Sequence, residues 1–218
     1  MKPLIKIIFL IAAFFASTFL LIKFTGILTI EHIENWLIYA KELSPIYMGV
    51  LIILLLFADL FIAIPTLTVI ILSGYFLGHV NGAIAALTGL MLAGVFGYLL
   101  SRYYGSAILN FLVKDEIKRN EAIIAFQKHG VVMILLSRAM PILPEVTACL
   151  SGMTNMPFSK FLVTWSISSV PYVFIASYAG SISSIDDPKP AIYTAIGLSA
   201  VLWSFWFFYN RAHAKSTS

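Results

Sequence analysis

The chain has 218 residues, of which 60% are hydrophobic and 11% are charged, with a formal net charge of +4. Soluble domains carry about 25% charged residues, so this composition, with a mean hydropathy of +0.94, excludes a soluble domain and indicates an integral membrane protein. The sequence has no basic stripe interleaved with aromatics, which argues against nucleic-acid binding. Its small positive charge suits anionic lipid head groups.

The first predicted element is a membrane helix over Leu4–Ile22. Its apolar run, Ile7–Ile22, exceeds the roughly 7–15 residues of a signal-peptide core, and no small-residue cleavage site follows. We therefore interpret it as a retained helix rather than a cleaved signal peptide. Thr29–Leu43 carries apolar residues at helical spacing, which predicts an amphipathic helix in the membrane interface. Residues 1–44 thus form an N-terminal unit.

Two apolar regions in the central part, residues 45–180, are too long for one simple span. They are Pro45–Leu77 and Val131–Tyr178. Each is interrupted by prolines, which lack an N–H group and clash with the preceding helical turn. The breaks fall at Pro65 in the first region and at Pro141, Pro144 and Pro157 in the second.

Simpler segments fill the rest of the chain. Gly82–Tyr104 and Ala191–Tyr209 each have the length of one membrane helix. Asn110–Gly130 predicts a second amphipathic helix, more basic than the first. Residues 181–218 therefore form a C-terminal membrane helix with a basic cytoplasmic tail.

The placement of Lys and Arg predicts the orientation of this all-α polytopic protein. If Pro45–Leu77 and Val131–Met156 are re-entrant hairpins, about four helices span the membrane and both termini share one side. That side collects most basic residues: Lys2, Lys6, Arg102, Lys114, Lys118, Arg119, Lys128, Lys160, Arg211 and Lys215. The other side collects Lys23, Lys41 and Lys189. We therefore expect both termini in the cytoplasm and hairpins that enter from opposite faces.

The two broken regions share a pattern. Asp59 precedes Pro65 by six positions, and Arg138 precedes Pro144 by six. The letters LSG then follow each proline and end at Gly74 and Gly152. The pattern predicts an inverted repeat, which in transporters brings broken helices together near the midplane. The alternative is that the prolines only kink ordinary spanning helices.

Three charged residues fall inside the two predicted hairpins, Pro45–Leu77 and Val131–Met156: Asp59, Arg138 and Glu145. A charge at the centre of a membrane helix costs about 2.5–3.5 kcal/mol, so such residues usually have a function. We expect them to line a polar cavity that handles a lipid head group or a proton. The alternative is structural, with Arg138 in a salt bridge with Asp59 or Glu145.

No enzymatic or cofactor motif is present, because the sequence has no nucleophile elbow, no phosphate-binding loop and no metal-ligand spacing. Cys149 is the only cysteine, which excludes an intrachain disulfide. Small residues at intervals of four predict close helix packing: Gly74, Gly78 and Gly82, then Gly89, Ala93 and Gly97. The tryptophans are expected in interfacial belts or in lipid contact: Trp36, Trp165, Trp203 and Trp206.

Three parts of the sequence carry a resemblance: an acidic residue before "IPTLTVIILSGYFLG", the helix "GLMLAGVFGYLLSRYYG" and the stretch "LLSRAMPILPEVTACLSGMTNMPFSKF". Taken together, they resemble the DedA superfamily. The closer similarity is to its VTT-domain branch, related to SNARE-associated Golgi proteins, over about residues 45–180. The resemblance implies two hairpins that face each other from opposite sides, and lipid translocation. Eukaryotic members of the family are phospholipid scramblases, and some bacterial ones return undecaprenyl phosphate across the plasma membrane.

The chain also departs from the DedA pattern. Arg138 and Pro141 match an arginine and a proline of that branch, but Pro144 stands where it has a second arginine. Asp59 matches one of two acidic positions, and the other falls near Leu67, which cannot ionise. These departures favour the VTT-domain branch and weaken an assignment to undecaprenyl phosphate.

The sequence and the resemblance together predict a lipid translocase or scramblase of a bacterial plasma membrane. Its substrate would be a phosphate-bearing lipid, either a phospholipid or a polyprenyl phosphate. Arg138 would bind the phosphate, and Asp59 would hold Arg138 in the empty state or accept a proton that releases it. Protons and a second copy of the chain are further candidate partners. The alternatives are a proton-coupled transporter of a small solute and a non-transporting membrane assembly factor.

Overall fold

The computed structural model describes residues 2–25, 35, 38–39, 44–62, 64–112, 114–140, 142–183 and 189–214. All of its regular elements are helical, as predicted. They are α1 (Lys2–Thr25), α3 (Pro45–Ala58), α4 (Thr66–Leu77), α5 (His79–Leu112), α6 (Glu116–Leu136), the short 3-10 helix η1 (Ser137–Ala139), α7 (Leu143–Met153), α8 (Phe158–Ser181) and α9 (Lys189–Ala214). Most of the predicted interfacial helix, Thr29–Leu43, lies outside the described residues.

Within the described part, three segments are long and apolar enough to cross a membrane: His79–Gly105, Glu116–Ala139 and Phe158–Ser181. The first segment contains the predicted span Gly82–Tyr104, and the third overlaps the end of the predicted region Val131–Tyr178. The second segment corrects a prediction. The amphipathic helix Asn110–Gly130 is predicted to end where the apolar region Val131–Tyr178 begins, but one helix runs across that boundary. Asp115 caps the start of α6 by accepting hydrogen bonds from the N–H groups of Ile117 and Lys118, and the helix continues through Gly130 to Leu136 without a break.

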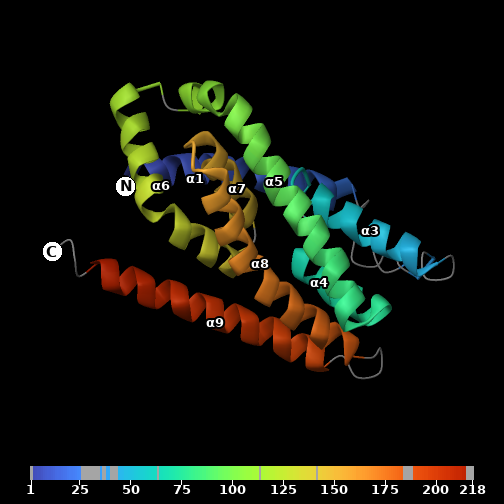
Figure 1. Cartoon of the computed structure of the whole chain (residues 1–218). Helices are drawn as coiled ribbons and strands as arrows, with labels where there is room; N and C mark the ends of the chain where they lie inside the picture. Colours follow the sequence, from blue (N-terminus) through green and yellow to red (C-terminus); the bar gives the residue numbers. More distant parts are fainter. Residues whose placement is uncertain are drawn as a thin grey trace.

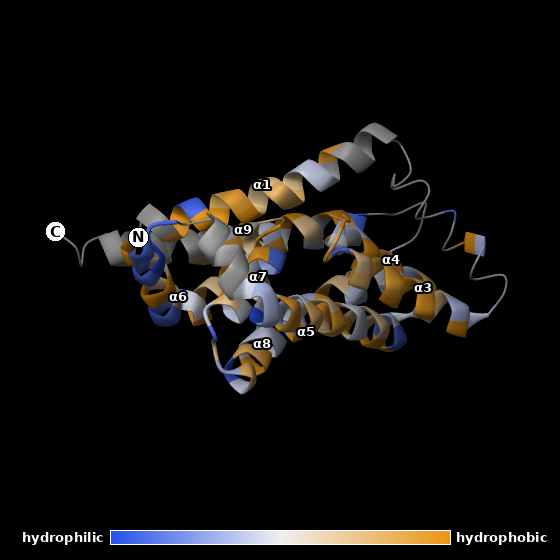
Figure 2. Cartoon of the chain, turned by 90° about the horizontal axis from the view of Figure 1, so that it is seen from above, coloured by the Kyte–Doolittle hydropathy of each residue, from blue (hydrophilic) through white to orange (hydrophobic). Residues whose placement is uncertain are grey.

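Two pairs of helices stand at opposite ends of the molecule. Figure 1 shows α3 and α4 at one end, α6 and α7 toward the other, and the long helices α5 and α8 passing between them. The start of α1 and the end of α9 lie together at the end that holds α6 (Figures 1 and 2). Each pair has its break near the middle of the molecule, between α3 and α4 and between α6 and α7.

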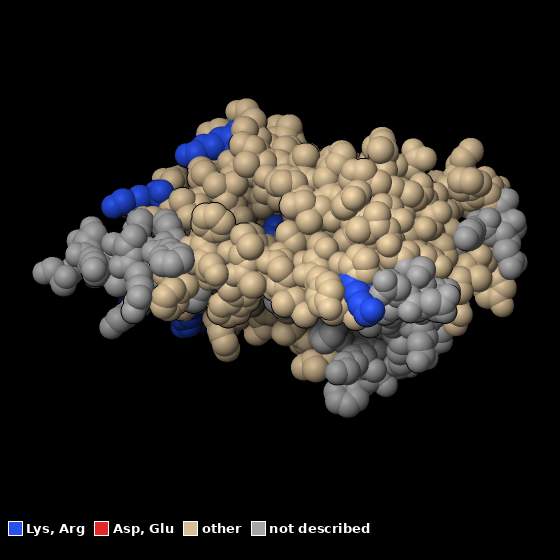
Figure 3. All heavy atoms as spheres, turned by 90° about the horizontal axis from the view of Figure 1, so that it is seen from below, with Lys and Arg blue, Asp and Glu red and all other residues tan. Residues whose placement is uncertain are grey.

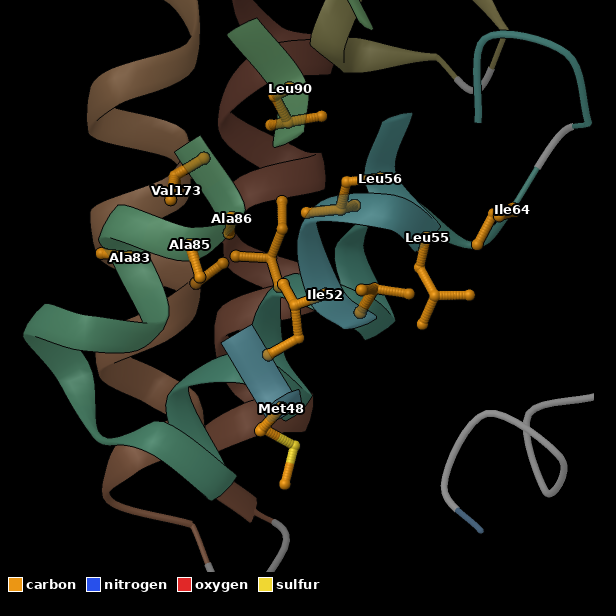
Figure 4. Close-up of a cluster of buried hydrophobic side chains, with 13 residues drawn as sticks. Met48, Ile52, Leu55, Leu56, Ile64, Ala83, Ala85, Ala86, Leu90 and Val173 are labelled. Carbon is orange, nitrogen blue, oxygen red and sulfur yellow. The ribbon is translucent and has the colours of Figure 1, made fainter. Parts of the chain in front are cut away.

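The apolar core follows this division. One cluster joins α3, α4, the first half of α5 and the second half of α8, and includes Ile52, Leu56, Ala86 and Val173 (Figure 4). A second cluster joins α1, α6 and α7, and a third joins α5, α6, α7 and α8. Hydrophobic residues run along most of α3, α4 and α5, whereas hydrophilic ones concentrate in α6, at the end of the molecule where α1 begins (Figure 2).

Two crossings of helix backbones hold the pairs in place. Where α4 crosses α8, a Cβ atom on Gly74 would lie 1.9 Å from the carbonyl oxygen of Ser177, and one on Gly180 would lie 1.8 Å from that of Ile71. Where α7 crosses α5, a Cβ on Gly152 would lie 2.2 Å from the carbonyl oxygen of Tyr98. Thus α4 packs on α8, the long helix that follows α7, and α7 packs on α5, the long helix that follows α4.

The predicted role of small residues in packing is confirmed at Gly74, Gly82, Gly89 and Gly97, where an added Cβ would meet other atoms at less than 3.0 Å. It is wrong for Gly78, which has nothing within 4 Å of such a Cβ. Gly78 has φ 78°, so it is needed for the turn between α4 and α5.

Candidate functional site

A cavity of about 410 Å³ lies where the two breaks meet. Its lining comes from both breaks and from three covering helices. The residues are Phe15 of α1; Asp59, Ile64, Pro65, Thr66, Leu67 and Thr68 of the first break and α4; Arg138, Ala139, Met140, Ile142, Pro144 and Glu145 of the second break and α7; Tyr172 of α8; and Ser199 of α9. The structure therefore brings together all three ionisable residues that the sequence singles out.

Asp59 lies at the end of α3, and its side chain caps the start of α4. Its Oδ1 accepts a hydrogen bond from the N–H group of Ile64 at 2.8 Å, and its Oδ2 accepts one from Thr66 Oγ1 at 2.5 Å. The residue before α4 is Pro65, which offers no side-chain acceptor, so the first free groups of the helix need another partner. Asp59 is only 4% exposed, and its carboxylate accepts the hydrogen bonds from these groups.

Arg138 lies in η1, directly after α6, and rests on one face of α8. Its Nη2 donates a hydrogen bond to Ser169 Oγ at 2.9 Å. The guanidinium carbon is 4.9 Å from the ring centre of Trp165 and 5.7 Å from that of Tyr172. Its Nε is buried and has no hydrogen-bond partner among the residues that the structure describes. A buried donor without a partner is costly, so this arginine can still bind an acceptor.

Glu145 lies in the first turn of α7, where the helix dipole favours a negative charge. Glu145 lines the cavity, and its carboxylate is not within 4.0 Å of the Arg138 guanidinium. An ion pair joins Lys118 and Asp115 at 3.0 Å at the start of α6. None within 4.0 Å joins Arg138 to Asp59 or Glu145. The direct salt bridges considered for Arg138 are therefore absent, and opposite charges share one cavity without touching.

The predicted hairpin residues have distinct positions. Pro65 precedes α4 and Pro144 is in the first turn of α7, while Gly74 and Gly152 form the helix crossings. Pro141 lies outside the described residues. The neighbouring Ile142 has φ 73°, a rare conformation for a β-branched residue, at the point where the chain enters α7.

Sequence reasoning missed the α8 side of the site. Trp165 is 3% exposed, so its predicted place in an interfacial belt or in lipid contact is wrong. Trp165, Ser169 and Tyr172 have the spacing i, i+4, i+7, which places them on one helix face. That spacing was a usable signal, because it puts a hydroxyl between two aromatic rings.

Figure 3 shows a small hollow near the middle of the face seen from below, with a basic side chain at its bottom. On the same face, most other Lys and Arg atoms gather at one end.

We expect Asp59→Ala to destabilise the protein by about 2–4 kcal/mol, because it leaves the N–H of Ile64 and the hydroxyl of Thr66 buried without their acceptor. Asp59→Asn should cost less than half of that, because its amide oxygen can still accept from Ile64. Thermal unfolding of the detergent-solubilised variants measures the difference. Equal losses for Ala and Asn would contradict the capping role.

Comparison with known proteins places the fold in a family. Residues 64–182 match the model of the VTT domain. The chain belongs to the VTT domain family. This is the DedA type of multi-pass membrane protein, so the resemblance inferred from the sequence is confirmed. No solved structure matches the chain significantly.

Two relatives from Bacillus subtilis (strain 168) are similar to this VTT domain protein. One is named undecaprenyl phosphate transporter A, with 27% identity over 128 residues, which is 54% of this chain and 64% of the relative. The other is the uncharacterized protein YqeD, with 28% identity over 152 residues, which is 68% of this chain and 72% of the relative. The match therefore spans less than two thirds of the transporter's length.

Proposed function

We propose that this protein moves a phosphate-bearing lipid across the membrane, with the head group passing through the cavity between the two breaks. The observation that carries the proposal is the state of Arg138. Arg138 lines the cavity, its guanidinium is held by Ser169 and two rings, and its buried Nε has no partner in the described part of the chain. A planar guanidinium with free donors suits phosphate oxygens.

The surroundings support the same function. A head group cannot cross hydrocarbon unaided, and a polar cavity lowers that barrier while the lipid tails stay in the bilayer. The lining combines Arg138 with the hydroxyls of Thr66, Thr68 and Ser199. The relative named undecaprenyl phosphate transporter A handles a lipid of the same phosphate-bearing class, which supports a lipid substrate at modest identity.

The proposal includes two re-entrant hairpins that form an inverted repeat. Their support is the position of the pairs α3–α4 and α6–α7 at opposite ends of the molecule (Figure 1). Further support comes from the matching roles of two glycines. Gly74 of α4 lies at the crossing with α8, and Gly152 of α7 lies at the crossing with α5. The breaks expose backbone groups, which is tolerable at membrane depth only where protein or a cavity covers them.

The test is reconstitution of the purified protein in vesicles that contain a fluorescent phospholipid or a fluorescent polyprenyl phosphate, together with an internal pH dye. Movement of labelled lipid to the outer leaflet without any added solute supports the translocase. Proton flux that depends on an added solute, with no lipid movement, would favour a proton-coupled solute transporter. A folded protein with neither activity would favour an assembly factor.

We predict that both termini and the basic end of the molecule face the cytoplasm. In a Cys149→Ser background, Val80→Cys and Ile182→Cys, whose parent residues are exposed at the opposite end, should react with an impermeant maleimide added to intact cells. Lys114→Cys and Lys160→Cys should react only after the membrane is opened. Labelling of Lys114→Cys in intact cells would refute this orientation.

A further inference from the structure

We propose that Trp165 is a positioning residue that fixes the plane of the Arg138 guanidinium and so prepares it to bind phosphate. This inference rests on the phosphate-binding role proposed above. The guanidinium lies over the indole ring at 4.9 Å, a distance at which a cation and an aromatic face attract each other. Trp165 itself is buried, so the interaction is shielded from water.

The indole ring is held rigidly by α5. Its Nε1 donates a hydrogen bond to the carbonyl oxygen of Leu90 at 3.2 Å. One turn further along α5, the ring occupies the space left by Gly94, where an added Cβ would lie 2.4 Å from Cε2 of the indole. Phe161 packs on the ring at a centroid distance of 5.5 Å. The ring therefore has little freedom to turn.

Two further side chains of α8, Ser169 and Tyr172, also contact Arg138. Together with Trp165 they form a cradle of α8 side chains around it. Ser169 accepts from Nη2 at 2.9 Å, and the ring of Tyr172 lies 5.7 Å from the guanidinium carbon. Arginine has a long, flexible stem, so a fixed plane lowers the entropy lost on binding a ligand.

The cradle also explains why opposite charges coexist in the cavity. Glu145 and Asp59 both line the space that Arg138 faces, yet neither is within ion-pair distance of it. Asp59 is held by Ile64 and Thr66, and Arg138 is held by α8. Without the indole, the guanidinium would be free to turn toward a carboxylate and form a buried ion pair. Such a pair would occupy the group that the phosphate needs.

The experiment compares three variants of the full-length protein in detergent. Trp165→Leu removes the aromatic face, Trp165→Phe keeps a face but loses the bond to Leu90, and Gly94→Ala displaces the ring. The probe is dihexanoylphosphatidic acid, a soluble short-chain lipid, and its Kd is measured by calorimetry. We expect the Kd to rise about tenfold in Trp165→Leu and Gly94→Ala, and less than threefold in Trp165→Phe.

A merely structural role predicts a different result: all three variants would lose thermal stability without a change in Kd. A folded Trp165→Leu variant with the wild-type Kd, or equal Kd values for Leu and Phe, overturns the proposal. Should Trp165→Leu fail to fold, Tyr172→Leu removes the second ring and tests the same cradle, again with a higher Kd expected.

A second measurement separates this inference from the proposed function. The rate at which phenylglyoxal modifies Arg138, followed by mass spectrometry of its peptide, reports the freedom of the guanidinium without any ligand. We expect faster modification in Trp165→Leu than in the wild type. If the wild type binds no phosphatidic acid but this acceleration is seen, the phosphate role fails and the positioning role stands. An unchanged rate overturns the positioning role.

Discussion

Arg138→Lys should slow lipid movement in reconstituted vesicles by about a hundredfold while the protein remains folded. Lysine keeps the charge but loses the planar fork, the hydrogen bond to Ser169 and much of the stacking on Trp165. One lost charge-assisted hydrogen bond together with weaker stacking costs about 2–3 kcal/mol. That energy corresponds to roughly a hundredfold in rate.

The matched control is Arg119→Lys, the same chemical change on α6 outside the cavity lining. We expect its rate to stay within about twofold of the wild type, because surface charges contribute little. Lipid movement at the wild-type rate in Arg138→Lys would mean that a point charge suffices and that the bidentate role is wrong.

Gly74→Ala should destabilise the protein by more than about 3 kcal/mol, enough to prevent recovery of folded protein from the membrane. The added Cβ would lie 1.9 Å from the carbonyl oxygen of Ser177 and 2.7 Å from its carbonyl carbon. Both are backbone atoms of α8, so no change of rotamer can relieve the clash, and α4 must move away from α8. Fluorescence-detected size-exclusion chromatography measures the loss of folded protein.

The matched control is Gly197→Ala in α9, where nothing lies within 4 Å of the new Cβ. Because alanine is the better helix former by about 1 kcal/mol, this variant should be as stable as the wild type or more stable. Folded Gly74→Ala protein with wild-type stability would show that α4 and α8 do not cross in contact.

The sequence was sufficient to locate both breaks and the three ionisable residues of the cavity. The reason is physical: prolines and charges are so costly in a membrane helix that their positions are informative without any knowledge of packing. The four residues that share this spacing, Asp59 with Pro65 and Arg138 with Pro144, all line the cavity.

The partners of the charges could not be predicted in the same way. Opposite charges suggested a salt bridge, but the break after Asp59 leaves groups at the start of α4 without partners, and these local donors bind the carboxylate instead. The partners of Arg138 come from α8, and which face of α8 meets η1 depends on how the two helices pack. Hydropathy alone also assigned Trp165 to the lipid, because a buried and a lipid-facing tryptophan look alike in a membrane sequence.

The crossing of α4 with α8 has a consequence for synthesis of the chain. Beside this crossing, Ser177 donates a hydrogen bond to the carbonyl oxygen of His79, a residue 98 positions earlier. At a typical rate of 5–20 residues per second, α4 waits roughly 5–20 s for its partner to be made. During that time the surface of α4 around Gly74 is not covered by α8. We therefore expect a chain that stops before α8 to be degraded, and separately expressed halves to restore each other.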